Sequence, residues 1–479
     1  MAKKRVLLTG ASGSMGGETF KELLRRKDKY DIVLILRPSK VNKKNFSQYE
    51  GQDGITIVWG DLSKPEDVLK AVTGVDHVLH PAAYISPAAD HNPKQARKSN
   101  YESAVNIIAA IKQQPDNGDN IRLVSIGTVA EYGDRLPPVH WVKVGDPLKP
   151  SVGDYYAITK IAAERAIIES GLKYWASMRQ TFIAIPNVYS LMDPIMFHQP
   201  PETHIEFITS QDAGYGLVQT LECPDDFYGR VYNMAGGPSC RFLYSDYLER
   251  FFKLFNLGDF RTMMDRNWFG ARNFHCCWYM DTYILNDYLG HWRQTFDDQI
   301  KQVDEMVPSI MKFGAGLAPK FIVKAFMKRM ADPLKWVQTN DEEKVKAFFG
   351  SREAWEKIGG WETYNPKRDT RDLRVEKDPL TKEYTLEEMQ ALAKSRGGEC
   401  LSKEYIDIKS KLKWKCASGH EWEATPRLHL TGHWCADCTP PPWDYDAQVK
   451  ADPALADIYC YNHDENESQR VDYLYCPNE

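Results

Sequence analysis

The sequence lacks several features that would place it in a specialised class. No apolar run is long enough to span a bilayer, which excludes an ordinary transmembrane helix. No excess of basic residues is present, because 61 Lys and Arg face 66 Asp and Glu. The net charge of -5 therefore gives no general attraction to nucleic acid or to anionic membranes. No internal repeat is found either.

The sequence also has few cysteines and shows no signal-peptide pattern. Ten cysteines among 479 residues do not make a disulfide scaffold, so thiols or metal ligands are expected. The first residues run directly into a strand-like segment at residues 5–9, which leaves no room for a signal peptide. These observations predict a cytoplasmic protein. The length predicts two or three domains, because one hydrophobic core does not extend over so long a chain.

A glycine-rich turn follows the first strand-like segment. Residues 5–9 lead into Gly10, Gly13 and Gly16, and a helical pattern covers residues 18–26. In this context Gly10 permits a tight turn, Gly13 permits close approach of a pyrophosphate, and Gly16 permits close helix packing. Free N–H groups at the helix start would face the phosphates. The alternative is an ordinary strand–loop–helix connection.

Residues 1–185 alternate between strand-like and helix-like segments. The further strand-like runs are continuous apolar stretches at 32–36, 55–59, 75–79 and 121–124, and a helical stretch covers 100–112. Continuous rather than alternating apolar runs indicate strands covered on both faces. The sequence therefore predicts an α/β fold with a Rossmann-type, doubly wound parallel sheet.

The end of the second strand bears on cofactor choice. An acidic residue here would bind the adenine ribose of NAD, whereas an arginine suits the 2′-phosphate of NADP. This end has no acid, and Arg37 is followed by Lys40 and Lys43, so NADP(H) is favoured and NAD(H) stays open. The alternative is that Arg37 is only a solvated charge. After the third strand, Asp61 is a carboxylate placed to hold the adenine amino group.

A tyrosine and a lysine four residues apart begin a later helix. This spacing places Tyr156 and Lys160 on one helix face, where the ammonium group would lower the pKa of the phenol. Tyr156 is then a candidate general acid/base. Tyr155 is the rival, but the residue four places after it, Thr159, carries no charge.

Together these motifs resemble those of the extended short-chain dehydrogenase/reductase superfamily, in its epimerase/dehydratase-like branch. The resemblance covers residues 1 to about 310. It rests on Thr9 through Gly16, Asp61-Leu62, His80-Pro81-Ala82-Ala83, Asn100, Thr128 placed four residues before Tyr132-Gly133, and Tyr156 through Lys160.

The resemblance implies roles for individual residues. Tyr156 would exchange a proton with the substrate oxygen, Thr128 would hydrogen-bond that oxygen, and Lys160 would hold the nicotinamide ribose. Asn100 would support the backbone near the active site. The catalytic set is thus Thr128, Tyr156, Lys160 and Asn100. The implied cofactor-binding set is Thr9, Gly10, Ser12, Gly13, Ser14, Met15, Gly16, Arg37, Asp61, Leu62, His80, Ala82, Ala83, Tyr156, Lys160, Pro186 and Val188.

Three functions fit this pattern. The main hypothesis is an NADP(H)-dependent oxidoreductase that interconverts a secondary alcohol and a ketone, because the loop after Ala83 is apolar. The alternative is an NAD-dependent sugar-nucleotide epimerase, with Arg230 and Arg241 as candidate diphosphate ligands. Dehydration is disfavoured, because the places where related dehydratases carry a carboxylate hold Val129 and Ala130. The third hypothesis is a non-catalytic dinucleotide-binding sensor or scaffold.

The C-terminal third contains a metal-ligand pattern. Cys416 and His420 form one closely spaced pair, and Cys435 and Cys438 form a second. This pattern suits a tetrahedral Cys₃His zinc site with no open position, so the zinc would be structural. It resembles zinc-ribbon or treble-clef modules. Substitute ligands are Cys400, His429 and His433.

The predicted organisation has four parts. Residues 1–310 form the extended dehydrogenase/reductase domain, with the Rossmann core at 1–185 and a smaller, aromatic-rich substrate lobe at 186–310. Residues 311–384 form a helical connecting segment, 385–440 the small zinc-binding β-rich module and 441–479 an acidic tail. The basic amphipathic stretch 311–330 is expected to pack on its own protein rather than on a membrane. Beyond a small-molecule substrate, no nucleic-acid partner is expected, and the resemblance is compatible with a homodimer.

Overall fold

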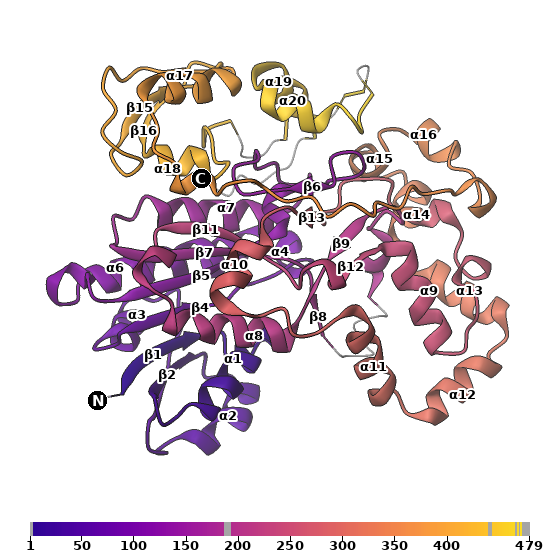
Figure 1. The fold of residues 1–479 in the computed structure, drawn as a ribbon. Helices are drawn as coiled ribbons and strands as arrows, with labels where there is room; N and C mark the ends of the chain where they lie inside the picture. Colours follow the sequence, from indigo (N-terminus) through magenta and orange to yellow (C-terminus); the bar gives the residue numbers. More distant parts are fainter. Residues whose placement is uncertain (1–2, 186–192, 439–442, 465–466, 469, 472–479) are drawn as a thin grey trace.

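A seven-stranded parallel sheet forms the centre of the molecule (Figure 1). The structure is a computed structural model and describes residues 3–185, 193–438, 443–464, 467–468 and 470–471. The strand order is β11-β7-β5-β4-β1-β2-β3. Its strands are β1 (Lys4–Thr9), β2 (Tyr30–Leu36), β3 (Ile55–Trp59), β4 (His77–His80), β5 (Arg122–Thr128), β7 (Tyr174–Gln180) and β11 (Arg230–Met234). The predicted doubly wound sheet is confirmed.

Helices cover both faces of this sheet, which explains its continuous apolar strands. One face packs against α1 (Ser14–Arg25), α8 (Ser210–Gln219) and α10 (Thr282–Leu289). The other packs against α3 (Pro65–Val72), α6 (Ser103–Lys112) and α7 (Tyr155–Ile168). The smaller elements around the sheet are α2 (Lys40–Phe46), α4 (Ala88–His91), α5 (Pro93–Ala96), β6 (Trp141–Val142), β8 (Ile183–Ala184), β10 (Ile208–Thr209) and β13 (Trp278–Tyr279).

The helix after the glycine turn begins earlier than the sequence pattern predicts. It starts at Ser14, directly after Gly13, whereas the apolar periodicity begins near Glu18. Gly13 is the N-cap residue in extended conformation, and no side chain caps the helix. The first turn of α1 therefore faces the end of β1 with its backbone N–H groups free of side-chain caps.

A second lobe follows the sheet in the chain. An aromatic core holds it together, and its buried aromatic members are Phe197, Phe207, Phe242, Tyr244, Phe252, Phe260, Trp268, Phe269 and Phe296. Its elements are β9 (His204–Glu206), β12 (Arg241–Leu243), α9 (Tyr244–Leu254), α11 (Phe296–Met306), α12 (Ser309–Leu317), α13 (Lys320–Met330), α14 (Asp332–Gln338), α15 (Glu342–Phe349) and α16 (Arg352–Glu356). The stretch predicted as one amphipathic element at 311–330 is two helices, because Pro319 cannot continue α12.

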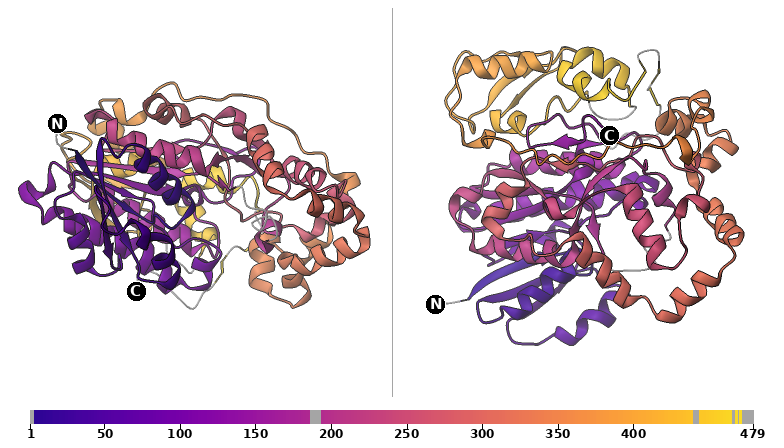
Figure 2. Two further views of the ribbon diagram at one scale, coloured as in Figure 1. Left: turned by 90° about the horizontal axis from the view of Figure 1, so that it is seen from below. Right: turned by 45° about the vertical axis from the view of Figure 1, so that its right-hand side comes forward.

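An extended segment returns from this lobe to the sheet. Asp369 accepts a hydrogen bond from the Trp141 indole at 2.7 Å, and Asp378 accepts one from Arg230 at 2.9 Å. Between them, the backbone N–H of Val375 donates to the Met280 carbonyl at 3.2 Å. Figure 2 shows this segment crossing the body before the chain enters its C-terminal module.

The C-terminal module is a three-stranded sheet with two helices. It comprises α17 (Leu386–Ser395), β14 (Glu399–Cys400), β15 (Leu412–Lys415), β16 (Glu421–Ala424) and α18 (Pro426–Leu430). Its Trp414 is fully buried and belongs to the same hydrophobic cluster as Trp175 of the central sheet. The module thus extends the core behind α7. The tail adds α19 (Tyr445–Ala451) and α20 (Pro453–Tyr459).

Among the described residues, no helix is both long enough and apolar enough to cross a membrane.

Candidate functional site

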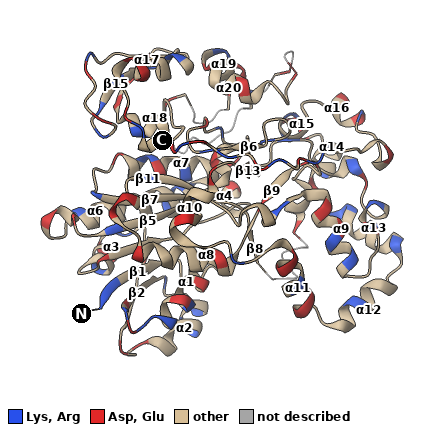
Figure 3. Cartoon of the chain, viewed as in Figure 1, with Lys and Arg blue, Asp and Glu red and all other residues tan. Residues whose placement is uncertain are grey.

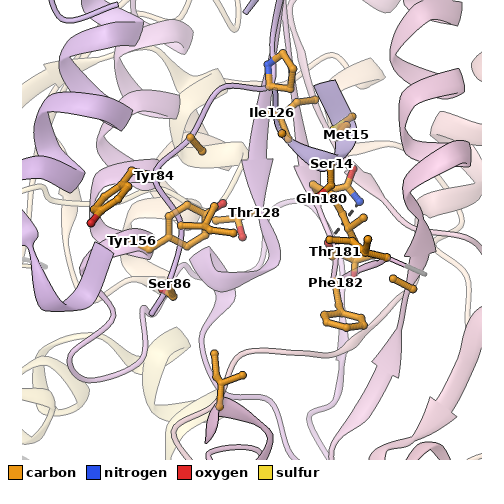
Figure 4. A pocket seen from close by; sticks show the side chains of 18 of the residues that line it. Ser14, Met15, Tyr84, Ser86, Ile126, Thr128, Tyr156, Gln180, Thr181 and Phe182 are labelled. Atoms are coloured by element: carbon orange, nitrogen blue, oxygen red, sulfur yellow. Dashed lines mark hydrogen bonds between the residues drawn. The ribbon is translucent and has the colours of Figure 1, made fainter. Parts of the chain in front are cut away.

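A pocket of about 920 Å³ lies between the sheet and the second lobe. One end is lined by the turn after β1, and the other by α9, α12 and α13. The carboxyl ends of parallel strands form this kind of crevice, which is where doubly wound folds bind their ligands. Figure 4 shows Tyr84, Thr128 and Tyr156 on one side, and Gln180, Thr181 and Phe182 on the other.

The glycine turn is held by close packing at two positions. Gly10 has φ +64°, and a Cβ there would lie 2.8 Å from Ala82 Cα. A Cβ on Gly16 would lie 2.1 Å from the Gly10 oxygen, so both positions require glycine. At Gly13 a Cβ would meet only the Gly10 oxygen, at 3.4 Å, because Gly13 faces the pocket. This open face fits the approach of a dinucleotide pyrophosphate.

Thr9 and His80, predicted as cofactor ligands, do not line the pocket. Both are buried, and Thr9 Oγ1 lies 2.9 Å from His80 Nδ1. Thr9 Oγ1 also accepts a hydrogen bond from the Ala82 backbone N–H at 3.2 Å. Burial lowers the pKa of His80 to about 3, so its ring is neutral. The pair therefore positions the backbone of the pocket wall from behind it.

The adenosine end carries one cation and one carboxylate. Arg37 and Asp61 both line the pocket. Burial opposes ionisation of Asp61, but hydrogen bonds from Ser63 and the charge of Arg37 outweigh it and lower the pKa. Lys43 points elsewhere, since its ammonium nitrogen lies 3.6 Å from the centre of the Trp59 ring. The remaining predicted cofactor residues in the lining are Ser12, Ser14, Met15, Leu62, Ala82 and Ala83.

Tyr156 enters the pocket from the first turn of α7. Asp154 caps this helix by accepting a hydrogen bond from the Ala157 backbone N–H at 2.8 Å. The cap fixes which of two adjacent tyrosines faces the ligand. Tyr156 lines the pocket and is hydrogen-bonded to Thr128, whereas Tyr155 is 4% exposed and packs edge-on against Trp443.

The ionisation of Tyr156 differs from the sequence-based expectation. Burial and the nearby carboxylates, Glu131 foremost, raise the pKa of Tyr156, and the Thr128 hydrogen bond lowers it only in part. Lys160 is buried and does not line the pocket, and Glu131 and Glu164 are the charges that stabilise its ammonium form. The expected lowering by Lys160 is therefore not observed, and desolvation sets the direction of the shift in the pKa of Tyr156.

Asn100 clamps the loop that carries Tyr84. Its carbonyl oxygen accepts from the Tyr84 backbone N–H at 2.7 Å, and its amide donates to the Tyr84 carbonyl at 3.0 Å. The same amide donates to Thr159 Oγ1 on α7 at 3.0 Å. Asn100 thus ties one pocket wall to the helix that bears Tyr156.

Glu131 is turned away from the pocket. Its carboxylate accepts a hydrogen bond from the Thr128 backbone N–H at 2.9 Å and lies 3.2 Å from Arg179 Nε. Val129 lines the pocket, but its side chain is apolar. The described lining therefore has no carboxylate next to Thr128.

Two further polar groups near Tyr156 were not predicted. His275 lines the pocket, and its Nδ1 lies 2.9 Å from Asp154 Oδ2. Asp90 accepts a hydrogen bond from the Tyr156 backbone N–H at 3.3 Å, and burial together with the Asp154 charge raises the pKa of Asp90 to about 7. No spacing signals this cluster, because its members are brought together only by the fold.

The lobe side of the pocket is apolar and aromatic. The lining contributed by α9, α12 and α13 consists of Tyr244, Tyr247, Leu248, Phe251, Phe252, Met311, Ala315 and Met327. In the described lining Arg37 is the only arginine or lysine. Arg230 pairs with Asp378 and Arg241 with Glu206 and Asp372, and neither arginine lines the pocket, so the structure gives no support to their role as diphosphate ligands. Two predicted cofactor residues, Pro186 and Val188, lie outside the described residues.

A second cluster of functional groups lies in the C-terminal module. Ligand atoms of Cys416, His420, Cys435 and Cys438 all lie within 4.8 Å of one another. His420 Nδ1 lies 3.4 to 3.5 Å from the three sulfurs, and the Cys416 and Cys438 sulfurs are 3.7 Å apart. Tetrahedral zinc with its usual bond lengths gives N–S and S–S edges of about 3.6 and 3.8 Å.

The substitute ligands lie outside this cluster. The Nε2 atom of His433 is bonded to Glu164, at 2.8 Å. The Nε2 atom of His429 accepts from the Trp422 indole at 3.3 Å.

Comparisons with known proteins relate the N-terminal part to one family. Residues 6–210 match the model of the NAD dependent epimerase/dehydratase family. An inverting UDP-N-acetylglucosamine 4,6-dehydratase from Campylobacter jejuni is 30% identical over 108 residues, which are 22% of this chain. The match spans 32% of that relative, about a third of its length.

Solved structures share the fold. A dTDP-glucose 4,6-dehydratase from Streptomyces venezuelae, solved with NAD bound, superposes with a TM-score of 0.51 at 18% identity, over 63% of this chain and 96% of that one. A UDP-Glc/GlcNAc 4-epimerase from Campylobacter jejuni gives 0.50 at 16% identity, over 63% and 97%. The structural likeness supports the Rossmann-type fold, and the family match applies to residues 6–210.

The main functional prediction is wrong by this comparison. It assigns an oxidoreductase that interconverts a secondary alcohol and a ketone, whereas the Campylobacter jejuni relatives in sequence are sugar-nucleotide dehydratases and the two superposed structures are a sugar-nucleotide dehydratase and an epimerase. The apolar loop after Ala83 does not predict the substrate class, because one wall of a pocket does not define the ligand.

Proposed function

We propose that this chain is a nicotinamide-dinucleotide-dependent sugar-nucleotide epimerase. The observation that supports it best is that Tyr156 and Thr128 share one pocket with the glycine turn, while the only nearby carboxylate after Thr128 is engaged elsewhere. A dehydratase must also remove a hydroxyl group, and no acid beside Thr128 is placed to assist that step. Epimerisation needs only oxidation and re-reduction at one carbon.

The chain's own residues would move and orient one proton. The glycine turn and Arg37 would hold the dinucleotide, which would supply reversible hydride transfer at the substrate carbon. Tyr156 takes the proton from the substrate hydroxyl and gives it back, and Thr128 orients the oxygen by a hydrogen bond. Asn100 holds the Tyr84 wall of the pocket in register with α7.

The raised pKa of Tyr156 sets a condition on this proton transfer. A buried phenol resists ionisation, and only its phenolate form accepts the substrate proton, so a positive charge must come near it to stabilise the phenolate at neutral pH. Lys160 lies one helical turn further on the same face and is the candidate group. We infer that ligand binding brings the Lys160 ammonium and the Tyr156 hydroxyl into one hydrogen-bonded set.

The cofactor is proposed to be NADP(H) rather than NAD(H). Arg37 lines the adenosine end, no acid closes β2, and Asp61 lies beyond the third strand. An arginine suits a 2′-phosphate, whereas NAD binding sites of this fold use a carboxylate at the end of β2. Arg37 cannot accept hydrogen bonds from the adenine ribose hydroxyls, as a carboxylate at this position would.

The aromatic lobe side would take the nucleobase. Side chains of Tyr244, Tyr247 and Phe251 line this part of the pocket, and any base can stack on an aromatic ring. The described lining offers no cation here for a diphosphate, so backbone N–H groups and hydroxyls would bind those oxygens.

We further propose a structural zinc ion at Cys416, His420, Cys435 and Cys438. The near-tetrahedral edges of the four ligand atoms support it, and four protein ligands leave no position for a substrate. Such an ion would stabilise a small module whose own core is limited.

Incubation with sugar nucleotides tests the function. The full chain is supplied with NADP⁺ or NAD⁺ and with UDP-N-acetylglucosamine, UDP-glucose or dTDP-glucose, and products are followed by NMR and mass spectrometry. An epimer of unchanged mass supports the proposal, and a product that has lost water identifies a dehydratase instead. Tyr156→Phe should abolish turnover and keep cofactor affinity, whereas Tyr155→Phe, its buried neighbour, should keep both. If the cofactor binds and none of these substrates yields an epimer, the assignment is contradicted.

A further inference from the structure

Helix α12 has no buried side chain. The structure buries none of its residues, and Ile310, Phe313 and Leu317 are 79%, 67% and 68% exposed. These three residues are spaced three and four apart, which places them on one face of the helix. An amphipathic helix of a globular protein normally turns such a face inward. Here the apolar face points to solvent.

Helix α13 is apolar on two opposite sides. Met327 and Met330 pack into the aromatic core of the second lobe, with Val323 beside them. On the other side, Phe321 is 75% exposed and Ile322 is 52% exposed. Packing on the protein's own body therefore accounts for one side of α13 only, which differs from the expectation that this stretch simply covers its own protein.

The exposed apolar residues are concentrated in one place. More than half of the large exposed apolar side chains in the described part of the chain lie between residues 306 and 326. They are Met306, Ile310, Met311, Phe313, Leu317, Phe321, Ile322 and Phe326. A concentration of exposed apolar side chains of this kind marks an interaction site.

Positive charge surrounds this surface. Residues 309–330 contain five basic residues and no acidic one. Lys312 pairs with Asp304 and Lys324 with Asp265. In the described part of the molecule no ion pair involves Lys320, Lys328 or Arg329, and all three are exposed. Figure 3 shows basic residues on α12 and α13 at the outer edge of the second lobe.

The two helices also wall the pocket. They lie at the outer edge of the lobe, away from the C-terminal module (Figures 1 and 2). Met311 and Ala315 of α12, with Met327 of α13, belong to the pocket lining. The exposed apolar surface is thus continuous with the lobe side of the pocket.

We propose that α12 and α13 form a docking surface for anionic phospholipid bilayers. Apolar side chains on these helices enter the boundary between headgroups and acyl chains, and the flanking lysines and arginine bind lipid phosphates. A second copy of the chain is a poorer occupant, because a two-fold contact would bring the same basic residues together without acidic partners. The docked molecule would present its pocket wall to the membrane surface. This proposal is independent of the reaction assigned to the pocket.

Vesicle sedimentation with the full chain tests the proposal. The chain should sediment with vesicles of phosphatidylcholine mixed with phosphatidylserine and remain in the supernatant with phosphatidylcholine alone. Binding should weaken with added salt, since the attraction to anionic lipid is screened. No sedimentation with the anionic vesicles would overturn the proposal.

Two sets of substitutions separate the apolar and the charged contributions. Phe313→Ser with Phe321→Ser, and separately Lys320→Glu with Lys328→Glu, should each lower vesicle binding by about tenfold or more. All four positions are exposed, so folding should be retained, and circular dichroism with a melting curve checks this. Matched controls are Ile406→Ser, also exposed, and Lys409→Glu with Lys411→Glu, and these should bind as the wild type does.

Light scattering tests whether a second copy of the chain, rather than a membrane, covers this surface. If the wild type is a dimer that Phe313→Ser with Phe321→Ser converts to a monomer, and the dimer does not bind vesicles, a second copy covers the surface and the membrane proposal is wrong. A wild type that binds anionic vesicles through these residues supports it in either oligomeric state.

Discussion

The imidazole Nε2 of His433 lies 2.8 Å from Oε1 of Glu164, and both side chains are buried. His433 belongs to the C-terminal module, whereas Glu164 lies on α7 about two helical turns beyond Tyr156. Arg179 of β7 completes the contact by donating to Glu164 Oε1 at 2.6 Å and to the Thr431 carbonyl at 2.7 Å. The module therefore rests directly on the back of the helix that carries the proposed acid/base.

Removal of the imidazole should loosen this contact. His433→Ala leaves a buried carboxylate with one partner fewer, which should lower the free energy of unfolding by about 1–3 kcal/mol. Urea unfolding measures the change. His91→Ala, at an exposed histidine, should leave the unfolding midpoint unaltered. An unchanged midpoint for His433→Ala would mean that the module and α7 are not coupled through this bond.

Loss of the proposed zinc should unfold the module first. Elemental analysis of the purified chain should find about one zinc per chain. Cys438→Ser should lose this metal and lower the melting temperature, whereas Cys460→Ser, at an exposed cysteine outside the cluster, should keep both. A metal-free wild type that melts as the Cys438→Ser variant does would contradict the zinc assignment.

A methyl group on Gly13 should block the cofactor without harming the fold. In Gly13→Ala the new Cβ meets only the Gly10 oxygen at 3.4 Å and otherwise projects toward the pocket. We expect normal thermal stability and a dinucleotide affinity lowered by about tenfold or more, as measured by calorimetry. Gly17→Ala adds the same group at 3.5 Å from the Ala11 oxygen, outside the pocket lining, and should bind cofactor normally. Equal dinucleotide affinities of the two variants would contradict the assignment of pyrophosphate binding to Gly13.

Arg37 should decide between the two dinucleotides. The wild type should bind NADPH more tightly than NADH, and Arg37→Ala should weaken NADPH by about tenfold or more, because a hydrogen-bonded charge pair is lost. Binding of NADH should change little. Lys40→Ala, an exposed basic neighbour, is the matched control. Tighter binding of NADH by the wild type would contradict the proposed role of Arg37.

Asp90 should make stability depend on pH. Its pKa is raised to about 7 in the folded chain by burial and by the charge of Asp154, and His275 also faces this cluster. The unfolded chain ionises Asp90 near its reference pKa of about 3.9, so the folded state loses stability as the pH rises from about 4 to about 7.

Asp90→Asn should remove this loss. The free energy of unfolding of the variant, relative to that of the wild type, should rise across that pH interval by on the order of 4 kcal/mol at most. Urea unfolding at a series of pH values measures the difference, and Asp119→Asn, at an exposed carboxylate, should follow the wild type. A difference between wild type and Asp90→Asn that does not vary with pH would refute the raised pKa.

Local signals in the sequence predicted the elements that depend on neighbours in the chain. Thr385 and Glu388 form a capping box at the start of α17, a pattern readable from the sequence because both partners lie within one helical turn. The apolar strands and the glycine turn are local in the same sense. The start of α1 and the break at Pro319 were placed imperfectly, since cap geometry is not visible in apolar periodicity.

The sequence by itself determined the Rossmann-type sheet, the glycine turn, Tyr156 at the start of its helix and the four clustered metal-ligand residues. Each follows from short-range spacing and from the alternation of apolar and polar residues. Only the tertiary structure decided that His80 supports Thr9, that Arg230 and Arg241 pair with acidic residues, and that Glu131 turns away from the pocket. It also decided that α12 exposes its apolar face and that His433 meets Glu164. These relationships join residues far apart in the chain, and burial and charge at such contacts are fixed by packing, which no local pattern encodes.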